Sequence, residues 1–207
     1  MKTKHFTLIE LIMVMGVMIL LASIAIPAYS SLFSGRKTTL AANKVGAAIM
    51  TARAHAVSSK TYTAILFIKV ALADKGYTCF HMAEVYHNSD SSDYLWRRWV
   101  PGTTIIYLPE NTMIPSTNDD LGIGGVEGHK GNSAPPRVTN VNGSGYGGTY
   151  APAIIIKPNG QLAGTGDKNM IVRFVEVNRY ESNKSAPKLP LNVNWLTCKV
   201  KYLDPVE

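Results

Sequence analysis

Cysteine and catalytic motifs are both scarce in this chain, which has 2 cysteines among 207 residues. Cys79 and Cys198 can form one disulfide at most, and the alternative is two buried free thiols. Serine, histidine and aspartate are scattered without a nucleophile motif. Cys79 shares a strand alternation with His81 and His87, but their spacing does not match a known zinc site. We therefore expect no enzyme, no cofactor and no metal site.

Charged residues are also few, at 17% of the chain, and the net charge of +7 is only mildly basic. A hydrophobic content of 46% is sufficient for a packed core, and it excludes wholesale disorder. The length suits one globular domain of ordinary size plus an anchor. The basic excess could favour nucleic acid or anionic lipid, but it is common in proteins that bind neither.

The N-terminal region contains the longest apolar run in the chain. Residues 11–26 are apolar apart from Gly16 and Ser23. With residues 6–8 the run reaches about 20 residues, or ~30 Å of helix, which matches a bilayer core. Lys2 and Lys4 precede it, so we expect one membrane span with the rest of the chain on the far side.

A carboxylate, Glu10, interrupts the start of this run, where a charge is unfavourable in a bilayer. An ordinary signal peptide, cut near Ser23-Ile24-Ala25, and a plain anchor both leave Glu10 unexplained. In a monomer the side chain could snorkel to the cytoplasmic headgroups. A partner charge on another subunit would make the carboxylate far less costly.

The stretch FTLIELIMVMGVMILLASIAIP (6–27) resembles the N-terminal segment of type IV prepilins and of type II secretion pseudopilins. The resemblance implies cleavage by a prepilin peptidase between His5 and Phe6, and N-methylation of Phe6. It also implies that Glu10 pairs with the Phe6 α-amine of a neighbouring subunit, and that Pro27 kinks the helix. The family normally has glycine where this chain has His5, which puts the cleavage and the methylation in question.

The domain organisation follows from this segment. We expect a leader (1–5), a transmembrane and filament-core helix (6–29), an amphipathic continuation of the helix (30–60) and a β-rich head (61–207). In the continuation, Val45, Ile49, Ala52 and Ala56 recur at helical spacing and predict the buried face.

Strand patterns fill the head, so we predict a pilin-like α+β fold, in which the long helix packs on an antiparallel sheet. The predicted strands are 61–70 and 77–87, paired as a hairpin, followed by 103–108, 151–157, 170–177 and 195–203. Residues 112–149 are rich in Gly, Asn and Pro and predict an irregular surface loop with at most short strands. Residues 40–67 and the stretch IIIKPNGQLAG (154–164) resemble GspH/FimT-type minor pseudopilins.

These observations predict a structural subunit, a minor one, of a type IV pilus or a type II secretion pseudopilus. Its expected partners are other pilin or pseudopilin subunits, the prepilin peptidase and an inner-membrane assembly platform. We expect a single-pass inner-membrane protein whose head faces the periplasm or the exterior. The alternative is a filament-tip module that binds DNA or a surface ligand through Trp96, Arg97, Arg98 and Trp99. The more conservative interpretation of this patch is a strand or loop that buries one tryptophan.

Overall fold

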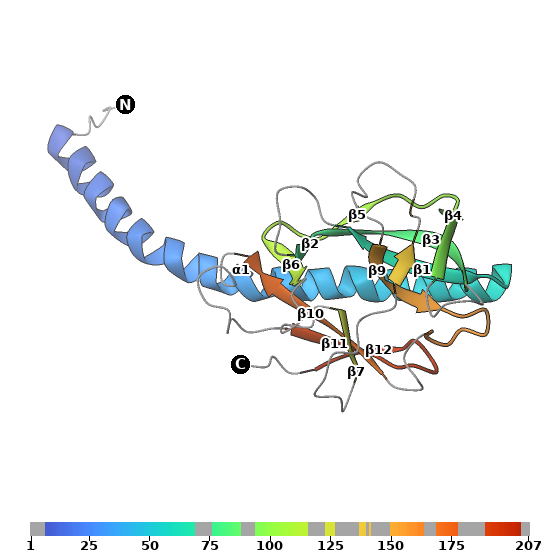
Figure 1. Ribbon diagram of the computed structural model, residues 1–207. Coiled ribbons are helices and arrows are strands. Elements are labelled where there is room, and N and C mark those ends of the chain that lie inside the picture. The colour runs from blue at the N-terminus through green and yellow to red at the C-terminus, as the bar shows by residue number, and fades with distance from the viewer. Residues whose placement is uncertain are drawn as a thin grey trace. The chain divides into compact units, whose positions relative to one another are not determined.

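The computed structural model describes residues 7–68, 76–87, 94–115, 123–126, 137–139, 141, 150–163, 169–177 and 189–203. At 26–35, 123–126, 137 and 150 it describes the backbone only. The chain divides into two compact units, Met1–Arg36 and Lys37–Glu207. Helix α1 (Leu8–Ser59) contributes to both units, and the described strands follow it (Figure 1). This order confirms the predicted α+β fold with a long N-terminal helix and a β-rich head.

The second part of α1 packs into the core of the second unit. Val45, Ile49, Ala52 and Ala56 are fully buried, which confirms the predicted face. Small side chains predominate on this face, which also includes Ala41, Ala42 and Ala48. They let the helix approach the strands closely, so this part of α1 belongs to the head rather than to a connector.

The first sheet contains the predicted hairpin, because β1 (Tyr62–Ile68) pairs antiparallel with β3 (Cys79–His87). The sheet follows the order β1-β9-β8-β4-β3-β5. The other strands are β4 (Tyr94–Trp99), β5 (Ile106–Tyr107), β8 (Arg137–Thr139) and β9 (Tyr150–Ile156). Since β1 pairs with both β9 and β3, five of these strands close into a ring. The pair β4–β8 is parallel, in contrast to the expected all-antiparallel sheet.

The second sheet follows the order β12-β11-β10-β6-β2, and β7 also pairs with β10. Its strands are β2 (Gly76–Tyr77), β6 (Thr112–Pro115), β7 (Ile123–Val126), β10 (Met170–Glu176), β11 (Leu189–Val193) and β12 (Val200–Tyr202). Strand β10 matches the prediction for 170–177. Strand β11 was not predicted, and β12 covers only the end of the predicted strand 195–203.

Two apolar clusters explain how the layers hold together. Ile65 and Phe67 of β1 face α1, and they share a cluster with side chains of α1 and of the second sheet. Ala64 and Leu66, which alternate with them, belong to a second cluster with residues from β3, β4, β8 and β9. The second part of α1 therefore lies between the two sheets, and the ring of strands has an apolar interior of its own (Figure 1).

The segment 112–149 was predicted to be an irregular surface loop, but its first residues form a buried strand. It contains the short strands β6, β7 and β8, as the prediction of short strands allowed. Met113 and Ile114 of β6, however, are buried almost completely, and Ile114 belongs to the cluster around α1. Residues 116–122, 127–136, 140 and 142–149 lie outside the described residues.

Candidate functional site

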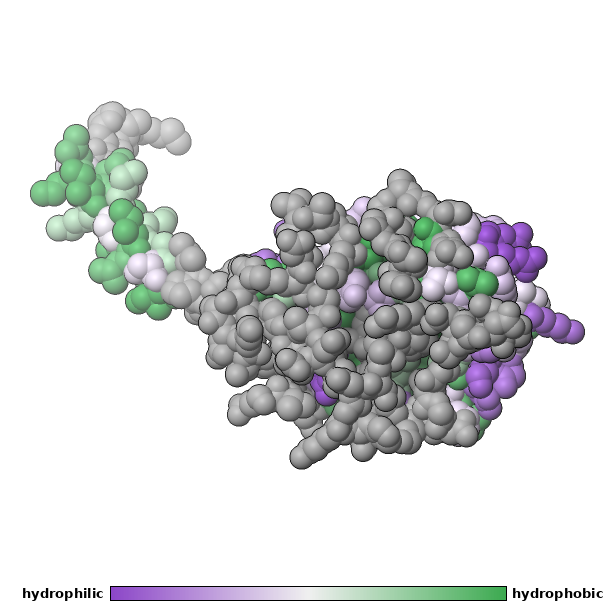
Figure 2. Space-filling view, in the orientation of Figure 1, coloured by the Kyte–Doolittle hydropathy of each residue, from purple (hydrophilic) through white to green (hydrophobic). Residues whose placement is uncertain are grey.

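The N-terminal part of α1 carries an apolar surface that the rest of its unit does not cover. Leu8–Ala25 has a mean hydropathy of 2.6 over 18 residues, and by length and composition it could cross a membrane. Every residue from Leu8 to Ala25 is exposed. Figure 2 shows hydrophobic side chains on this part of the helix. Such a surface requires a lipid or protein environment.

Thr7 and Glu10 form a capping box at the start of α1. The Thr7 backbone N–H donates to Glu10 Oε2 at 2.9 Å, and the Thr7 hydroxyl donates to the same oxygen at 3.0 Å. In return, the Glu10 backbone N–H donates to Thr7 Oγ1 at 3.4 Å. The T-x-x-E spacing typical of this motif is present in the sequence, where we interpreted Glu10 only as a charge.

Pro27 lies within α1, in the part where only the backbone is described. A kink at Pro27 therefore remains a prediction. His5 and Phe6, the expected cleavage and methylation positions, lie outside the described residues.

Strand β4 places the aromatic residues of the predicted ligand patch against the ring of strands. The Trp96 and Trp99 rings meet edge to face with centroids 5.6 Å apart, and both pack against the apolar interior of the ring. His81 of β3 stacks on Trp99 at 4.3 Å. Both tryptophans are half-buried, so they do not form a fully exposed stacking platform.

A β-bulge explains why Arg97 and Arg98 point to the same residue. Glu84 of β3 pairs with Arg98, and the next residue, Val85, pairs with Trp96, which leaves Arg97 as the extra residue. In a regular strand, two consecutive side chains point to opposite faces. The bulge redirects one of them, so both guanidinium groups approach the Glu84 carboxylate.

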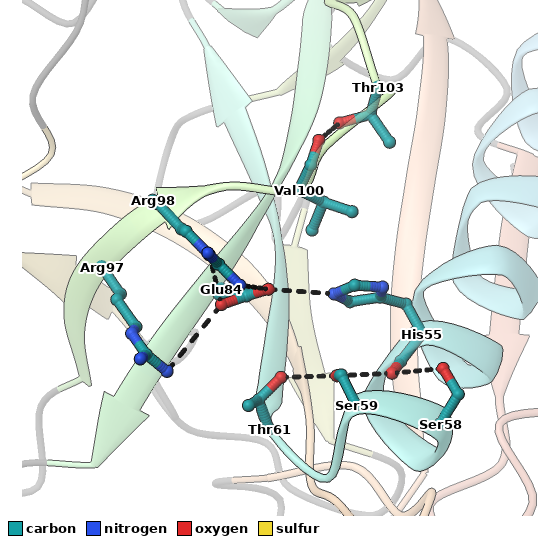
Figure 3. Close-up of polar contacts among 9 residues, drawn as sticks. All are labelled: His55, Ser58, Ser59, Thr61, Glu84, Arg97, Arg98, Val100 and Thr103. Carbon is teal, nitrogen blue, oxygen red and sulfur yellow. Dashed lines mark hydrogen bonds and ion pairs between the residues drawn. The ribbon is translucent and has the colours of Figure 1, made fainter.

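Glu84 is a buried carboxylate surrounded by cationic side chains and a histidine (Figure 3). Arg98 donates from Nε to Oε2 at 2.8 Å and from Nη2 to Oε1 at 2.9 Å, a bidentate pair. Arg97 Nη1 lies 3.9 Å from Oε2, and His55 Nε2 of α1 lies 3.3 Å from Oε1. The hydrogen bond from Arg98 lowers the pKa of Glu84 more than burial raises it, and His55 lowers it further.

This cluster joins α1 to β3 and β4, and it was not among the sites predicted from the sequence. Glu84 gave no signal in the sequence, because its partners lie 14 and 29 residues away. Arg98 of the predicted ligand patch is already paired with Glu84. The Arg97 side chain is 57% exposed and its contact with Glu84 is long. The four residues of the patch therefore lie together, but their main contacts are internal.

Cys79 and Cys198 are two free buried thiols, which is the second of the two alternatives that the sequence left open, and no disulfide joins them. Cys79 lies in β3 of the first sheet, whereas Cys198 lies in the loop before β12 of the second sheet. The Cys198 thiol donates to the Gly160 carbonyl at 3.2 Å. Burial raises the pKa of Cys198 to about 11 and also raises the pKa of Cys79, which disfavours the reactive thiolate.

The part of the chain that the structure describes contains no group of three or more His, Cys, Asp or Glu side chains that could hold a metal ion. His81 contacts Trp99 and the Thr103 carbonyl, while His87 contacts Tyr94, so neither joins Cys79 in a ligand set.

No protein-family model matches the chain, and no curated protein matches it. The solved structures that are similar to it include the following three. The minor pseudopilin EpsH from the type 2 secretion system of Vibrio cholerae has 10% identity and a TM-score of 0.41, with 81% of this chain and 96% of that chain covered. A second structure of EpsH has 11% identity and a TM-score of 0.44, covering 83% and 96%.

The type IV minor pilin FimU from Pseudomonas aeruginosa (strain PAO1) has 11% identity and a TM-score of 0.44, covering 85% of this chain and 97% of its own. In the sequence, residues 6–27 resemble prepilins and pseudopilins in general, whereas residues 40–67 and 154–164 resemble GspH/FimT-type minor pseudopilins.

Proposed function

We propose that the chain is a minor structural subunit of a type IV pilus or of a type II secretion pseudopilus. Before assembly, Leu8–Ala25 would hold it in the inner membrane. After assembly, the same segment would pack against the helices of other subunits. The observation that carries this proposal is the exposed apolar surface of Leu8–Ala25 with a single carboxylate, Glu10, in its first turn.

Two environments could cover this surface. Lipid suits its apolar side chains but not the Glu10 carboxylate, which the bilayer interior disfavours. A bundle of neighbouring helices suits both, because it can place a cation next to the carboxylate. The capping box satisfies hydrogen bonds of Glu10 within the chain but provides no neutralising charge. Glu10 therefore favours the assembled state over the isolated membrane helix.

The proposal also places the leader and the head on opposite sides of the membrane. Lys2 and Lys4 would keep the leader in the cytoplasm, so the head would lie on the periplasmic or exterior side. A prepilin peptidase would cut after His5 and methylate Phe6, and an inner-membrane platform would add the subunit to the filament. The filament-tip alternative gains no support from the contacts of Trp96–Trp99, since Arg98 binds Glu84 and both tryptophans pack inward.

Shearing of filaments from cells that express a C-terminally tagged chain tests this proposal. We expect tagged chain in both the sheared filament fraction and the inner membrane. Intact-mass analysis of the filament fraction should show an N-terminus at methylated Phe6. A tagged chain that is confined to the membrane under conditions where filaments form would contradict the proposal. A chain that begins at Met1 would contradict only the processing step.

A further inference from the structure

Exposed apolar side chains gather in the second unit around its first residues. In the part of this unit that the structure describes, eight large apolar side chains are exposed, and four of them lie here: Leu40, Ile105, Tyr107 and Tyr202. We call these four residues the collar. A cluster of exposed apolar side chains indicates a surface that contacts a membrane or another protein.

Contacts with two successive residues of α1 place the collar around one turn of the helix. Lys44 Nζ donates to the carbonyl of Tyr107, which belongs to β5 of the first sheet, at 2.9 Å. The hydroxyl of Tyr202, which belongs to β12 of the second sheet, donates to Asn43 Oδ1. Leu40 lies one turn before these two α1 residues. The collar therefore joins both sheets at one level of α1.

The core explains why the collar residues near β5 point outward. Ile106 and Leu108 pack in the cluster around α1, so the alternate residues Ile105 and Tyr107 face away from it. Tyr107 is 58% exposed, the highest value for a large apolar side chain among the described residues of the second unit. Tyrosine suits such a place when the neighbouring medium is part apolar and part aqueous, because its ring is apolar and its hydroxyl is polar.

The collar follows closely on the first charged residues after the membrane segment. Residues 11–35, between Glu10 and Arg36, contain no charged side chain and would form ~37 Å of helix. This length exceeds the ~30 Å hydrocarbon core, so we expect Arg36 and Lys37 to mark the start of the headgroup layer, which is ~5–7 Å thick on each side. Leu40 lies three residues after Lys37, or ~4.5 Å along the axis. Tilt of a helix that is too long for the bilayer would bring the collar still closer to the headgroups.

We propose that the collar rests on the headgroups of the membrane that holds Leu8–Ala25, and that Lys37 and Lys44 bind anionic lipid there. This inference rests on the proposed function, because it requires that the N-terminal segment spans a membrane before assembly. Aromatic side chains with a polar end are enriched at the membrane–water interface, and lysines next to a span attract anionic headgroups.

The charges near the collar favour an anionic surface. Every Lys, Arg, Asp or Glu of α1 after Glu10 is basic. Among the residues within four positions of a collar residue along the chain, the basic ones outnumber the acidic ones: Arg36, Lys37, Lys44, Lys199 and Lys201 against Glu110 and Asp204. The ammonium group of Lys44 has three N–H donors, so it can keep its bond to Tyr107 and still bind a lipid phosphate.

A photo-cross-linking phenylalanine analogue in place of Tyr107 of the full-length chain tests the contact. The chain is reconstituted in vesicles of phosphatidylcholine and phosphatidylglycerol, and lipid adducts are quantified by mass spectrometry. The matched control carries the analogue in place of Tyr86, which is 49% exposed and lies ~23 Å along β3 from Cys79, the residue that pairs with Tyr107. We expect at least about tenfold more lipid adduct at position 107 than at position 86. The analogue in place of Ile19 reports insertion of the segment.

Charge reversal tests the choice of lipid. Lys37→Glu should lower the lipid adduct at position 107 at least about fivefold, because it replaces attraction to phosphatidylglycerol by repulsion. Lys60→Glu is the matched control, since Lys60 is exposed and directly follows the end of α1, and it should leave the adduct unchanged. In vesicles of phosphatidylcholine alone, the adduct at position 107 should fall as it does for Lys37→Glu.

Several outcomes would overturn the inference. Equal lipid adduct at positions 107 and 86, with adduct present at position 19, would exclude the collar contact and leave the span intact. An adduct at position 107 that joins two chains would make the collar a subunit contact, and an unchanged adduct in Lys37→Glu would exclude anionic lipid. If the analogue at position 107 lowers the temperature of unfolding, the analogue in place of Leu40 repeats the test. Absence of the unchanged chain from sheared filaments contradicts the proposed function and leaves these results as they are.

Discussion

A Glu10→Ala chain is expected to insert into the inner membrane as well as the unchanged chain, or better, and to be absent from sheared filaments. Alanine removes the charge that the bilayer disfavours, so insertion should not suffer. It also removes the group that would pair with a cation of another subunit. The filament is then no longer lower in free energy than the isolated helix in the membrane. Immunoblots of the membrane and filament fractions measure both effects. Normal incorporation of this variant would refute the pairing role.

Thr7→Ala separates this role from capping. Thr7 and Glu10 bond reciprocally at the helix start, so Glu10→Ala removes part of a capping box as well as a charge. Thr7→Ala removes the side-chain part of the box and leaves the charge in place. Loss of an N-cap destabilises a helix by about 0.5–2 kcal/mol, which a long helix can tolerate. The Thr7→Ala chain should therefore enter filaments, and its exclusion would indicate that Glu10 acts mainly as a cap.

Ile49→Ala should destabilise the head by about 2–5 kcal/mol, because it leaves a cavity between α1 and the two sheets. Ile49 is fully buried in the cluster that joins these layers. The neighbouring residue, Met50, is 42% exposed, and Met50→Ala should change the free energy of unfolding by no more than ~0.5 kcal/mol. Urea unfolding of a fragment that begins at Lys37, the first residue of the second unit, measures both variants.

A similar loss for both variants would mean that α1 does not pack between the sheets by the face that carries Ile49. The comparison is informative because the two residues are adjacent, similar in size and on the same helix. It tests whether residues 37–59 form part of the head core, as the burial of the alanine-rich face indicates.

Local patterns in the sequence predicted the helix and most of the longer strands. The buried face of α1 was predicted because Val45, Ile49, Ala52 and Ala56 repeat at helical spacing. The hairpin β1–β3 and strands β9 and β10 were predicted from runs of β-branched and aromatic residues. The strong turn signal Pro158-Asn159-Gly160 in the sequence likewise predicts the turn that follows β9: the Gly160 N–H donates to the Lys157 carbonyl at 2.8 Å, and Ile156 pairs with Leu162 beyond it.

Side-chain hydrogen bonds overrode strand propensity near the C-terminus. The predicted strand 195–203 begins only at Val200 because Asn194 Oδ1 accepts hydrogen bonds from the backbone N–H groups of Leu196 and Thr197. These bonds form a turn that strand pairing would break. The same turn places Cys198 in a backbone conformation with φ of 52°, and its thiol donates to the Gly160 carbonyl.

Long-range pairing explains the features of the candidate site that the sequence did not reveal. The bulge at Arg97 depends on the register between β3 and β4, and that register is not encoded in the residues around Trp96–Trp99 alone. Glu84 becomes a buried anion only when α1 brings His55 to it and β4 brings Arg98. Closure of the ring likewise depends on β8 and β9, which lie far from β4 and β1 in the chain.

Position-by-position cross-linking along Leu11–Ser23 tests assembly through the N-terminal helix most directly. A photo-cross-linking residue is introduced at successive positions of the full chain, and cross-links from this chain to any neighbouring subunit are quantified in sheared filaments. If these helices pack against one another, cross-linking should rise and fall with a period of about 3.6 residues. We expect this periodicity in filaments. Uniform or absent cross-linking in filaments that contain the chain would contradict assembly through this helix.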